Sequence, residues 1–212
     1  MQPAVIFDMD GVLVNSEPLH ERSFLDVFAE IGYAENHGVD FPSYYGQTDR
    51  IVWRDFVERH RPPHTLEELL QRKEVRFKRL LEVHQPIFPG VLELLPALRQ
   101  RYALGLASGS RHPVIQAVLA LSDLRAQFQA VVSSEDVLHG KPAPDVFLRT
   151  AQLLGVDPEH CWVIEDSIAG VEAALAAGMR VIAIPNSLPA AALARAHHVL
   201  HTYDEIGRLL LG

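Results

Sequence analysis

The chain has 212 residues, of which 48% are hydrophobic and 22% are charged, with both signs interspersed. This composition excludes global disorder and is enough to bury a core in one large domain or two small ones. The formal net charge of −8 disfavours a nucleic-acid partner, because an acidic protein repels a phosphate backbone. A small anionic substrate is compatible with this charge if the site supplies its own cations.

We expect neither a membrane segment nor a signal peptide in this sequence. No apolar run approaches the roughly 18 residues that a membrane span needs, and no basic segment precedes an apolar one near the first residue. The one cysteine, Cys161, cannot form an internal disulfide and lies in an apolar stretch, so we expect a core residue rather than a reactive thiol. These features predict a cytoplasmic protein without a membrane partner, either a monomer or a weak dimer.

The predicted elements begin with a buried strand at residues 4–7, and a long helical region follows at 15–84. Within that region Thr65 and Glu68 have the spacing of a capping box, in which each side chain bonds to the backbone of the other residue. The helix that it opens carries apolar residues on one stripe, namely Leu66, Leu69, Leu70, Phe77, Leu80 and Leu81.

The rest of the chain alternates apolar runs with helical patterns. The further runs lack clean polar alternation, as expected of strands covered on both faces, and lie at 104–107, 130–133, 161–164 and 181–184. The helical patterns lie at 91–101, 113–121, 144–154 and 167–177, and an Ala-rich tract favours another helix at 190–196. This alternation predicts the α/β class, a Rossmann-like parallel sheet with right-handed crossovers.

The two patterns predict two domains. We expect residues 1–14 and 86–212 to form the α/β core, with the small helical cap inserted at 15–85. The hinges would lie at 15–18 and 85–89, where prolines limit the backbone conformations.

Two acidic pairs follow predicted strands. Asp8 and Asp10 follow the first strand, and Glu165 and Asp166 follow the fourth. Because ligands bind beyond the carboxyl ends of the strands in an open α/β sheet, both pairs could meet at one hard divalent cation such as Mg²⁺. Taken singly, the first pair could instead form a turn, and the second could cap the helix that follows.

Two further segments offer groups that bind anions. Ser108-Gly109-Ser110 joins a predicted strand to a helix, where a hydroxyl and free backbone N–H groups form an anion site, although an ordinary turn has the same pattern. Lys141 precedes Pro142, which stiffens the backbone, so this lysine could neutralise a phosphoryl oxygen rather than face solvent. A nucleophile, a cation, anion-binding donors and a proton shuttle are the parts of a phosphoryl-transfer site.

In order and approximate spacing these residues resemble the four motifs of the haloacid-dehalogenase-like phosphatase superfamily. The motifs are Phe7-Asp8-Met9-Asp10-Gly11-Val12, Ser108, Lys141-Pro142 and Glu165-Asp166. Two further stretches are similar to the β-phosphoglucomutase-like branch, in which a helical cap follows the first motif. They are Asn15-Ser16-Glu17-Pro18 and Ser167-Ile168-Ala169-Gly170-Val171. The resemblance covers essentially the whole chain.

The resemblance implies a Mg²⁺-dependent phosphatase that hydrolyses a small phosphomonoester through an aspartyl-phosphate. Asp8 would attack phosphorus, while Asp10 would protonate the leaving alcohol and then deprotonate the attacking water. Mg²⁺ would bind Asp8, the main-chain carbonyl of Asp10 and Asp166, with Glu165 as a further ligand or as a partner of the ligands. The residues that would hold the phosphoryl oxygens are Ser108, Gly109 and Lys141.

The resemblance also separates branches of the superfamily. Dehalogenase branches lack an acid at the position of Asp10, because a halide leaves without a proton, so Asp10 favours phosphate esters. The phosphonate-cleaving branch uses a cap lysine as a Schiff base. The cap lysines here, Lys73 and Lys78, are instead expected on a solvated helix face with i,i+4 pairing.

The cap leaves two activities open. Gly46 and Thr48 match the family's substrate loop, in which mutases place basic residues that hold a second phosphate; here only Arg50 is basic. The loop therefore favours a phosphatase acting on a small metabolite such as a sugar phosphate, with a β-phosphoglucomutase-type mutase as the alternative. His20, which the mutase branch shares, would contact the substrate and orient Asp10, or would simply pack as a polar helix residue.

Two readings from other classes compete with the enzyme. A non-catalytic metabolite-binding module is disfavoured because no member of the catalytic set is missing. A nucleotide-cofactor domain is disfavoured because the G-x-G-x-x-G pattern is absent. Zinc binding by His197, His198 and His201 would need further well-placed ligands, so we expect these histidines at the surface.

Overall fold

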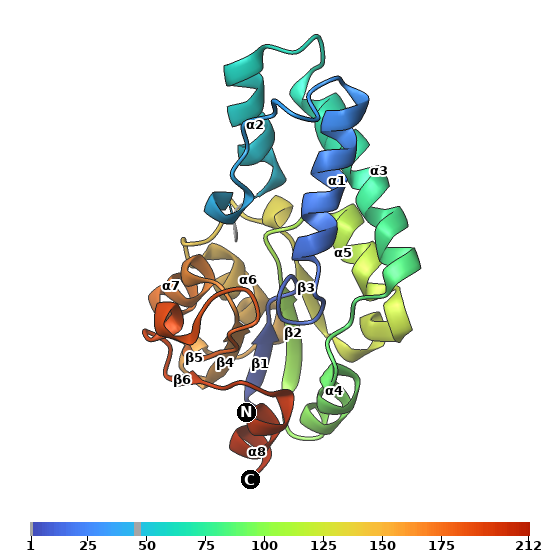
Figure 1. Cartoon of the computed structure of the whole chain (residues 1–212). Helices are drawn as coiled ribbons and strands as arrows, with labels where there is room; N and C mark the ends of the chain where they lie inside the picture. Colours follow the sequence, from blue (N-terminus) through green and yellow to red (C-terminus); the bar gives the residue numbers. More distant parts are fainter. Residues whose placement is uncertain (1, 45–47) are drawn as a thin grey trace. The chain divides into compact units, whose positions relative to one another are not determined.

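In the computed structural model of this protein, residues 2–44 and 48–212 are described. The chain divides into two compact units, an α/β unit of Met1–Asn15 with Ile87–Gly212 and a helical unit of Ser16–Pro86. The helical unit is inserted between β1 (Ala4–Phe7) and the remainder of the sheet (Figure 1). A parallel sheet core with a small helical insertion is the predicted fold class, which is confirmed.

Among the described residues, six parallel strands form one sheet in the order β3-β2-β1-β4-β5-β6. The strands after β1 are β2 (Ala103–Ala107), β3 (Ala130–Val132), β4 (Cys161–Glu165), β5 (Arg180–Ala183) and β6 (His198–Val199). β1 lies in the centre, where Val5 pairs with Leu104 on one side and with Trp162 on the other. The five predicted strands are confirmed, whereas β6 was not predicted because two residues are too short to show a period.

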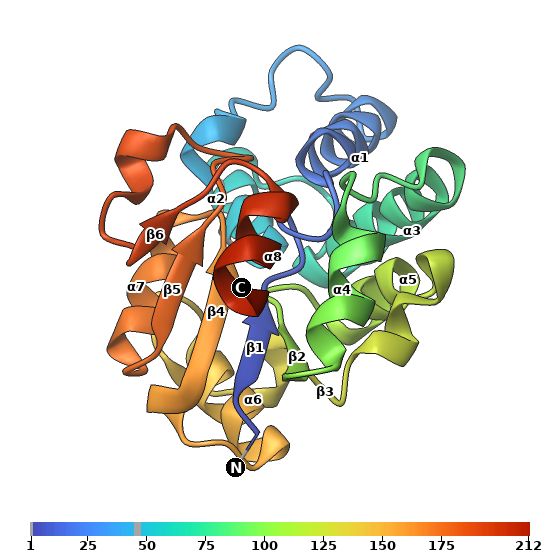
Figure 2. The same ribbon diagram turned by 90° about the horizontal axis from the view of Figure 1, so that it is seen from below.

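Helices cover both faces of the sheet (Figure 2). They are α4 (Val91–Arg99), α5 (His112–Leu119), α6 (Asp145–Leu154), α7 (Ile168–Ala176) and α8 (Tyr203–Leu211). α6 packs on β1, β2 and β3, and α7 packs beside it on β4 and β5, while α4 and α8 pack together on the other face. Every residue of β1 is therefore at most 1% exposed, and burying a side chain such as Phe7 contributes about 1.5–3 kcal/mol.

The helical unit has an aromatic core of its own. Its helices are α1 (Glu17–Glu30), α2 (Asp49–His60) and α3 (Leu66–His84). The ring of Phe28 contacts the rings of Trp53 and Phe56, with centroid separations of 4.9 and 4.8 Å. The predicted capping box is confirmed at the start of α3, where the Glu68 N–H donates to Thr65 Oγ1 and the Thr65 N–H donates to Glu68 Oε2 at 2.8 Å.

Lys73 on α3 does not lie on a solvated face. Its side chain is 0% exposed, and its Nζ lies 2.8 Å from Asp49 Oδ2, contacts His20 Nδ1, and faces the rings of Phe24 and Phe77 at 5.0 and 4.7 Å. The prediction of a solvated Lys73 was wrong, because three- and four-residue spacing places position 73 on the apolar stripe of this helix. The burial of an ammonium there is possible because a carboxylate accompanies it.

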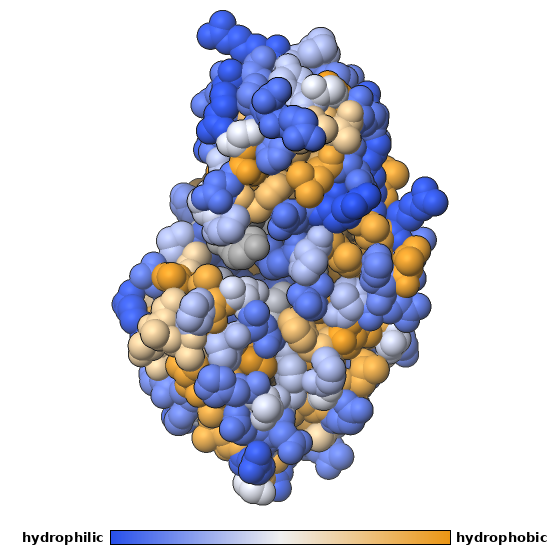
Figure 3. Space-filling model, in the orientation of Figure 1, coloured by the Kyte–Doolittle hydropathy of each residue, from blue (hydrophilic) through white to orange (hydrophobic). Residues whose placement is uncertain are grey.

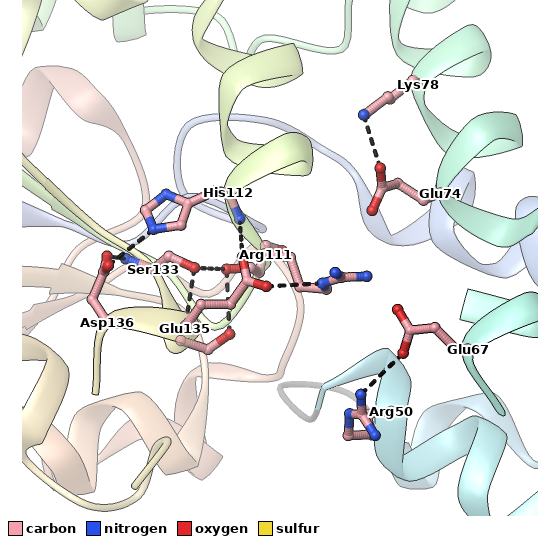
Figure 4. A network of polar contacts seen from close by, with 11 residues as sticks. Arg50, Glu67, Glu74, Lys78, Arg111, His112, Ser133, Glu135 and Asp136 are labelled. Carbon is pink, nitrogen blue, oxygen red and sulfur yellow. Dashed lines mark hydrogen bonds and ion pairs between the residues drawn. The ribbon is translucent and has the colours of Figure 1, made fainter. Parts of the chain in front are cut away.

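Other expectations have mixed outcomes. Lys78 pairs with Glu74 at 2.8 Å in the predicted i,i+4 arrangement (Figure 4). Cys161 is a core residue as predicted, and burial raises the pKa of its thiol to about 11. The helix expected at 190–196 is wrong, since the structure has a 3₁₀ turn at Ala190–Leu193 in which one residue, Leu193, is buried. Helix propensity without a face to pack does not sustain a longer helix.

Two of the three C-terminal histidines, His197 and His198, contact or belong to the edge of the sheet. His198 belongs to β6, and Nδ1 of the exposed His197 accepts a hydrogen bond from the Val181 N–H at 3.0 Å. Within the described part of the chain no helix has the length and apolar character needed to cross a membrane. Figure 3 shows hydrophilic residues over much of the visible face, with apolar residues between them.

Candidate active site

Asp8 follows the central strand directly. Its backbone N–H donates to the Ile164 carbonyl of β4 at 3.0 Å, and its side chain is almost fully buried. Oδ1 of this carboxylate lies 2.5 Å from Lys141 Nζ. Burial raises the pKa of Asp8 well above its usual range against the opposing effect of Lys141, and the carboxylates of Glu165 and Asp10 raise it further.

Lys141 is the cation of the site. Its Nζ donates to Asp8 Oδ1, to Glu165 Oε1 at 2.6 Å and to the Ala107 carbonyl at 3.4 Å, and it lies 4.8 Å from the centre of the Phe147 ring. Burial lowers the pKa of this ammonium, but the two carboxylates raise it by more. The two carboxylates therefore favour the charged form of Lys141, whose Nζ lies beside Asp8 at the end of the central strand.

Both oxygens of Glu165 are engaged. One accepts from Lys141, and the other accepts from the N–H groups of Asp166 and Ser167 and from the Ser167 hydroxyl, each at 2.9 Å. Gly170 on α7 makes room for this carboxylate, because a Cβ at that position would overlap it. Gly170 belongs to the motif Ser167-Ile168-Ala169-Gly170-Val171, whose sequence alone does not indicate this role.

Asp166 lies beside the Asp8–Asp10 segment. Gly11 permits this approach, since a Cβ on Gly11 would overlap the Asp166 carboxylate and its φ of +78° favours glycine. Burial and then the neighbouring charges of Glu165 and Asp8 raise the pKa of Asp166, against a hydrogen bond with Ser187. The site thus concentrates negative charge that a divalent cation would relieve.

The donor set fits a hard cation such as Mg²⁺. Among the described residues, no three His, Cys, Asp or Glu side chains are arranged to hold a metal ion, and Glu165 is already occupied by Lys141 and backbone donors. Asp8 and Asp166 would remain as carboxylate ligands, and the main-chain carbonyl of Asp10 would be a third oxygen. Oxygen ligands of this kind are those that Mg²⁺ prefers, with water completing the shell.

Asp10 is contacted from the loop after β2. Ser110 Oγ donates to Asp10 Oδ2 at 2.9 Å, and the Ser110 N–H donates to Ser108 Oγ at 3.0 Å. Ser108 is fully buried, with its N–H bonded to the Val132 carbonyl of β3 at 3.0 Å, whereas Gly109 is exposed. The motif assigned no separate role to Ser110, and the available signal was its position two residues after Ser108.

The remaining predicted residues belong to the helical unit. His20 lies on α1 with its side chain 15% exposed, and Thr48 precedes α2 without a capping hydrogen bond from its side chain. Arg50 forms an exposed ion pair with Glu67 at 3.3 Å (Figure 4). Gly46 lies outside the described residues. The structure therefore brings the α/β-unit candidates together and describes these cap candidates within their own unit.

Comparison with known proteins was made on sequence and on structure. The family model described as hydrolase, haloacid dehalogenase-like hydrolase, matches residues 3–178. Hexitol phosphatase B of Escherichia coli K12 is 38% identical over 184 residues, which are 86% of this chain and 83% of that protein. β-Phosphoglucomutase of Bacillus subtilis is 31% identical over 88% of this chain and 84% of its own length.

A solved structure extends the likeness to the fold. The crystal structure of CbbY from Rhodobacter sphaeroides in complex with phosphate has a TM-score of 0.86 and 26% sequence identity. It covers 98% of this chain and 97% of its own. The likeness therefore includes the α/β sheet and the helical insertion.

Proposed function

Since the chain belongs to the haloacid dehalogenase-like hydrolase family and is a phosphoric monoester hydrolase, we propose that it cleaves a small sugar or polyol phosphate through an aspartyl-phosphate on Asp8. The observation that carries this proposal is the buried Asp8 carboxylate at the end of the central strand, 2.5 Å from Lys141. A carboxylate nucleophile needs such a cation, because it must approach an anionic phosphoryl group.

The reaction divides into two displacements. Asp8 attacks phosphorus, the bond to the ester oxygen breaks, and Asp10 gives its proton to the departing alkoxide. Asp10 then takes a proton from water as that water attacks the phosphorus of the aspartyl-phosphate, which releases inorganic phosphate and restores Asp8.

The other residues of the site bind and hold charge. Lys141 and the Ser108 hydroxyl hold phosphoryl oxygens, and Glu165 keeps Lys141 directed at Asp8. Asp8, Asp166 and the main-chain carbonyl of Asp10 would hold Mg²⁺, which would supply positive charge beside the phosphoryl oxygens.

The charges of the helical unit support a monophosphate substrate. Among the described residues of this unit, Lys73 pairs with Asp49 at 2.8 Å and Arg50 pairs with Glu67 at 3.3 Å. A second phosphate needs cations that are not neutralised by carboxylates. In this proposal residues 15–85 form the specificity cap, and Thr48 and Arg50 contact the uncharged end of the substrate.

A phosphate-release panel of polyol and sugar phosphates tests the proposal. We expect turnover with Mg²⁺, loss of turnover with a chelator and its recovery on adding Mg²⁺. Asp8→Asn should lose at least about 10³-fold in kcat, because the nucleophile is removed. An active Asp8→Asn protein would exclude the nucleophile assignment.

The same panel decides between the alternatives. Conversion of a hexose 1-phosphate to its 6-phosphate that depends on a hexose bisphosphate, without net phosphate release, would establish the mutase that the β-phosphoglucomutase relative favours. A compound that raises Tm without being turned over would instead indicate a binding module.

A further inference from the structure

Ser110 connects two loops that are far apart in the sequence. Its hydroxyl donates to Asp10 Oδ2 at 2.9 Å, so it joins the loop after β2 to the loop after β1 across 100 residues. Asp10 is half-buried, and a carboxylate on a loop has several rotamers available. The hydrogen bond from Ser110 favours the rotamer that keeps Oδ2 toward Ser110, and it leaves Oδ1 to carry the proton that Asp10 transfers.

The backbone of Ser110 is fixed on both sides. Its N–H donates to Ser108 Oγ at 3.0 Å, and its carbonyl accepts from Ser133 Oγ at 2.8 Å. Ser133 is fully buried and takes part in a capping box, in which its N–H donates to Asp136 Oδ2 at 2.8 Å and its Oγ accepts from the Glu135 N–H at 3.1 Å. These hydrogen bonds restrain the loop, so the Ser110 hydroxyl stays in place and can hold the Asp10 carboxyl group in one orientation.

The residues after Ser110 are tied to the same capping box (Figure 4). Glu135 accepts from Arg111 Nε at 3.1 Å and from the His112 N–H at 2.9 Å. His112 Nε2 lies 2.9 Å from Asp136 Oδ1. The loop after β3 therefore braces the loop after β2 through side chains and backbone together.

We propose that Ser110 is the positioning residue that sets the orientation of Asp10 for proton transfer, with the Ser133 loop as its brace. The inference rests on the proposed function, in which Asp10 protonates the leaving alkoxide. A general acid contributes roughly 10²–10⁴-fold, and only when it lies within hydrogen-bond reach of the atom that it protonates. Loss of the Ser110 hydroxyl removes the orientation of Asp10 while the acid itself remains.

The leaving group supplies the discriminating measurement. An alkyl phosphate needs a proton on its departing oxygen, whereas p-nitrophenyl phosphate releases a stabilised phenolate that needs little help. The quantity to compare is kcat/KM, because it reports the steps up to departure of the leaving group and omits hydrolysis of the aspartyl-phosphate.

The isosteric pair Ser110→Thr and Ser110→Val differs by the hydroxyl. We expect Ser110→Val to lower kcat/KM about tenfold or more for the alkyl phosphate and less than about twofold for p-nitrophenyl phosphate. Ser110→Thr should keep both values near those of the unmodified protein. Ser122→Ala is the control, because Ser122 is an exposed serine on the 3₁₀ segment Leu121–Gln127, outside both loops, and both values should stay unchanged.

Two outcomes of Ser110→Val would overturn the inference. Equal losses of kcat/KM on both substrates would indicate that Ser110 binds the phosphoryl group. Full activity on both substrates would show that its hydroxyl is not needed. Tm of each variant reports folding, and Ser110→Ala replaces Ser110→Val if the valine variant does not fold. Asp8→Asn in the same assay separates the two claims. An active Asp8→Asn protein would overturn the proposed function. If Asp8→Asn is inactive and Ser110→Val loses equally on both substrates, only the role of Ser110 is overturned.

Discussion

Glu165 holds the ammonium of Lys141 2.6 Å from one carboxylate oxygen, while its other oxygen accepts three hydrogen bonds from the segment that begins α7. We propose that Glu165 orients Lys141 and is not a direct ligand of Mg²⁺, because its Oε2 already accepts three hydrogen bonds and its Oε1 is directed at Lys141. The distinction has consequences that can be measured.

Glu165→Gln keeps the size of the side chain and removes one acceptor and one charge. Removing a group that orients the ligands of a metal site commonly lowers activity about 10–100-fold. We expect kcat of Glu165→Gln to fall by a factor in that range. Asp166→Asn removes a proposed ligand, so it should raise the Mg²⁺ concentration that gives half-maximal activity. We expect that concentration to be at least about tenfold higher for Asp166→Asn than for Glu165→Gln. The reverse order in a Mg²⁺ titration would make Glu165 a ligand.

Gly170→Ala should damage the site without changing any polar group. A Cβ at Gly170 would overlap the Glu165 carboxylate, so Glu165 must turn away from Lys141. We expect a loss of kcat at least as large as that of Glu165→Gln. Gly207→Ala is the matched control, because its Cβ would meet Leu94 at an ordinary 3.5 Å and alanine should stabilise α8 by up to about 1 kcal/mol. Similar activities for the two variants would contradict the packing of Glu165 on α7.

Two lysines of α3 offer a comparison of a fully buried and a half-buried charge. Lys73→Ala removes a fully buried side chain and its ion pair with Asp49, so we expect the helical unit to lose about 2–4 kcal/mol of stability. Lys78→Ala breaks a half-buried i,i+4 pair with Glu74 and should cost about 0.5 kcal/mol or less.

Urea unfolding followed by fluorescence measures this difference. The two tryptophans lie in different units, so a Trp162→Phe background leaves Trp53 as the reporter of the helical unit. Following one unit avoids treating the whole chain as a single two-state transition. Equal shifts for Lys73→Ala and Lys78→Ala would mean that Lys73 is solvated.

Glu135 gives the brace a pH dependence. The hydrogen bond from the His112 backbone N–H lowers the pKa of Glu135, against some burial and with help from Arg111. Because the pKa is lower in the folded state, the stabilisation is complete above the ordinary glutamate value of 4.5 and is lost as pH falls through the folded value. The group is largely exposed, so we expect at most about 1 kcal/mol, or about 2–4 °C in Tm, at pH 7.

Thermal unfolding of Glu135→Gln from pH 7 to pH 3 checks this sign. The variant should melt below the unmodified protein at pH 7, and the two should converge by pH 3. Glu159→Gln, an exposed glutamate on the 3₁₀ turn Pro158–His160, should run parallel to the unmodified protein. A difference that grows toward acid would reverse the assignment.

Much of the α/β unit could be predicted from local pattern. Runs such as 4–7 and 161–164 are apolar throughout because helices cover both faces of a parallel sheet, and strand ends place Asp8 and Asp166 at one edge. The short β6 and the 3₁₀ turn at Ala190–Leu193 could not be predicted, because packing against neighbours decides them.

The sequence by itself determined which chemical groups stand at the strand ends and, through their order and spacing, the resemblance to a phosphatase family. Only the tertiary structure decided how these groups share the work. The contacts of Lys141 with Asp8 span 133 residues and those of Ser110 with Asp10 span 100, and a local pattern carries no record of partners so distant. Helix packing likewise decided the burial of Lys73 beside Asp49. A lysine is normally exposed, and it is buried only where the fold places a carboxylate next to its ammonium group.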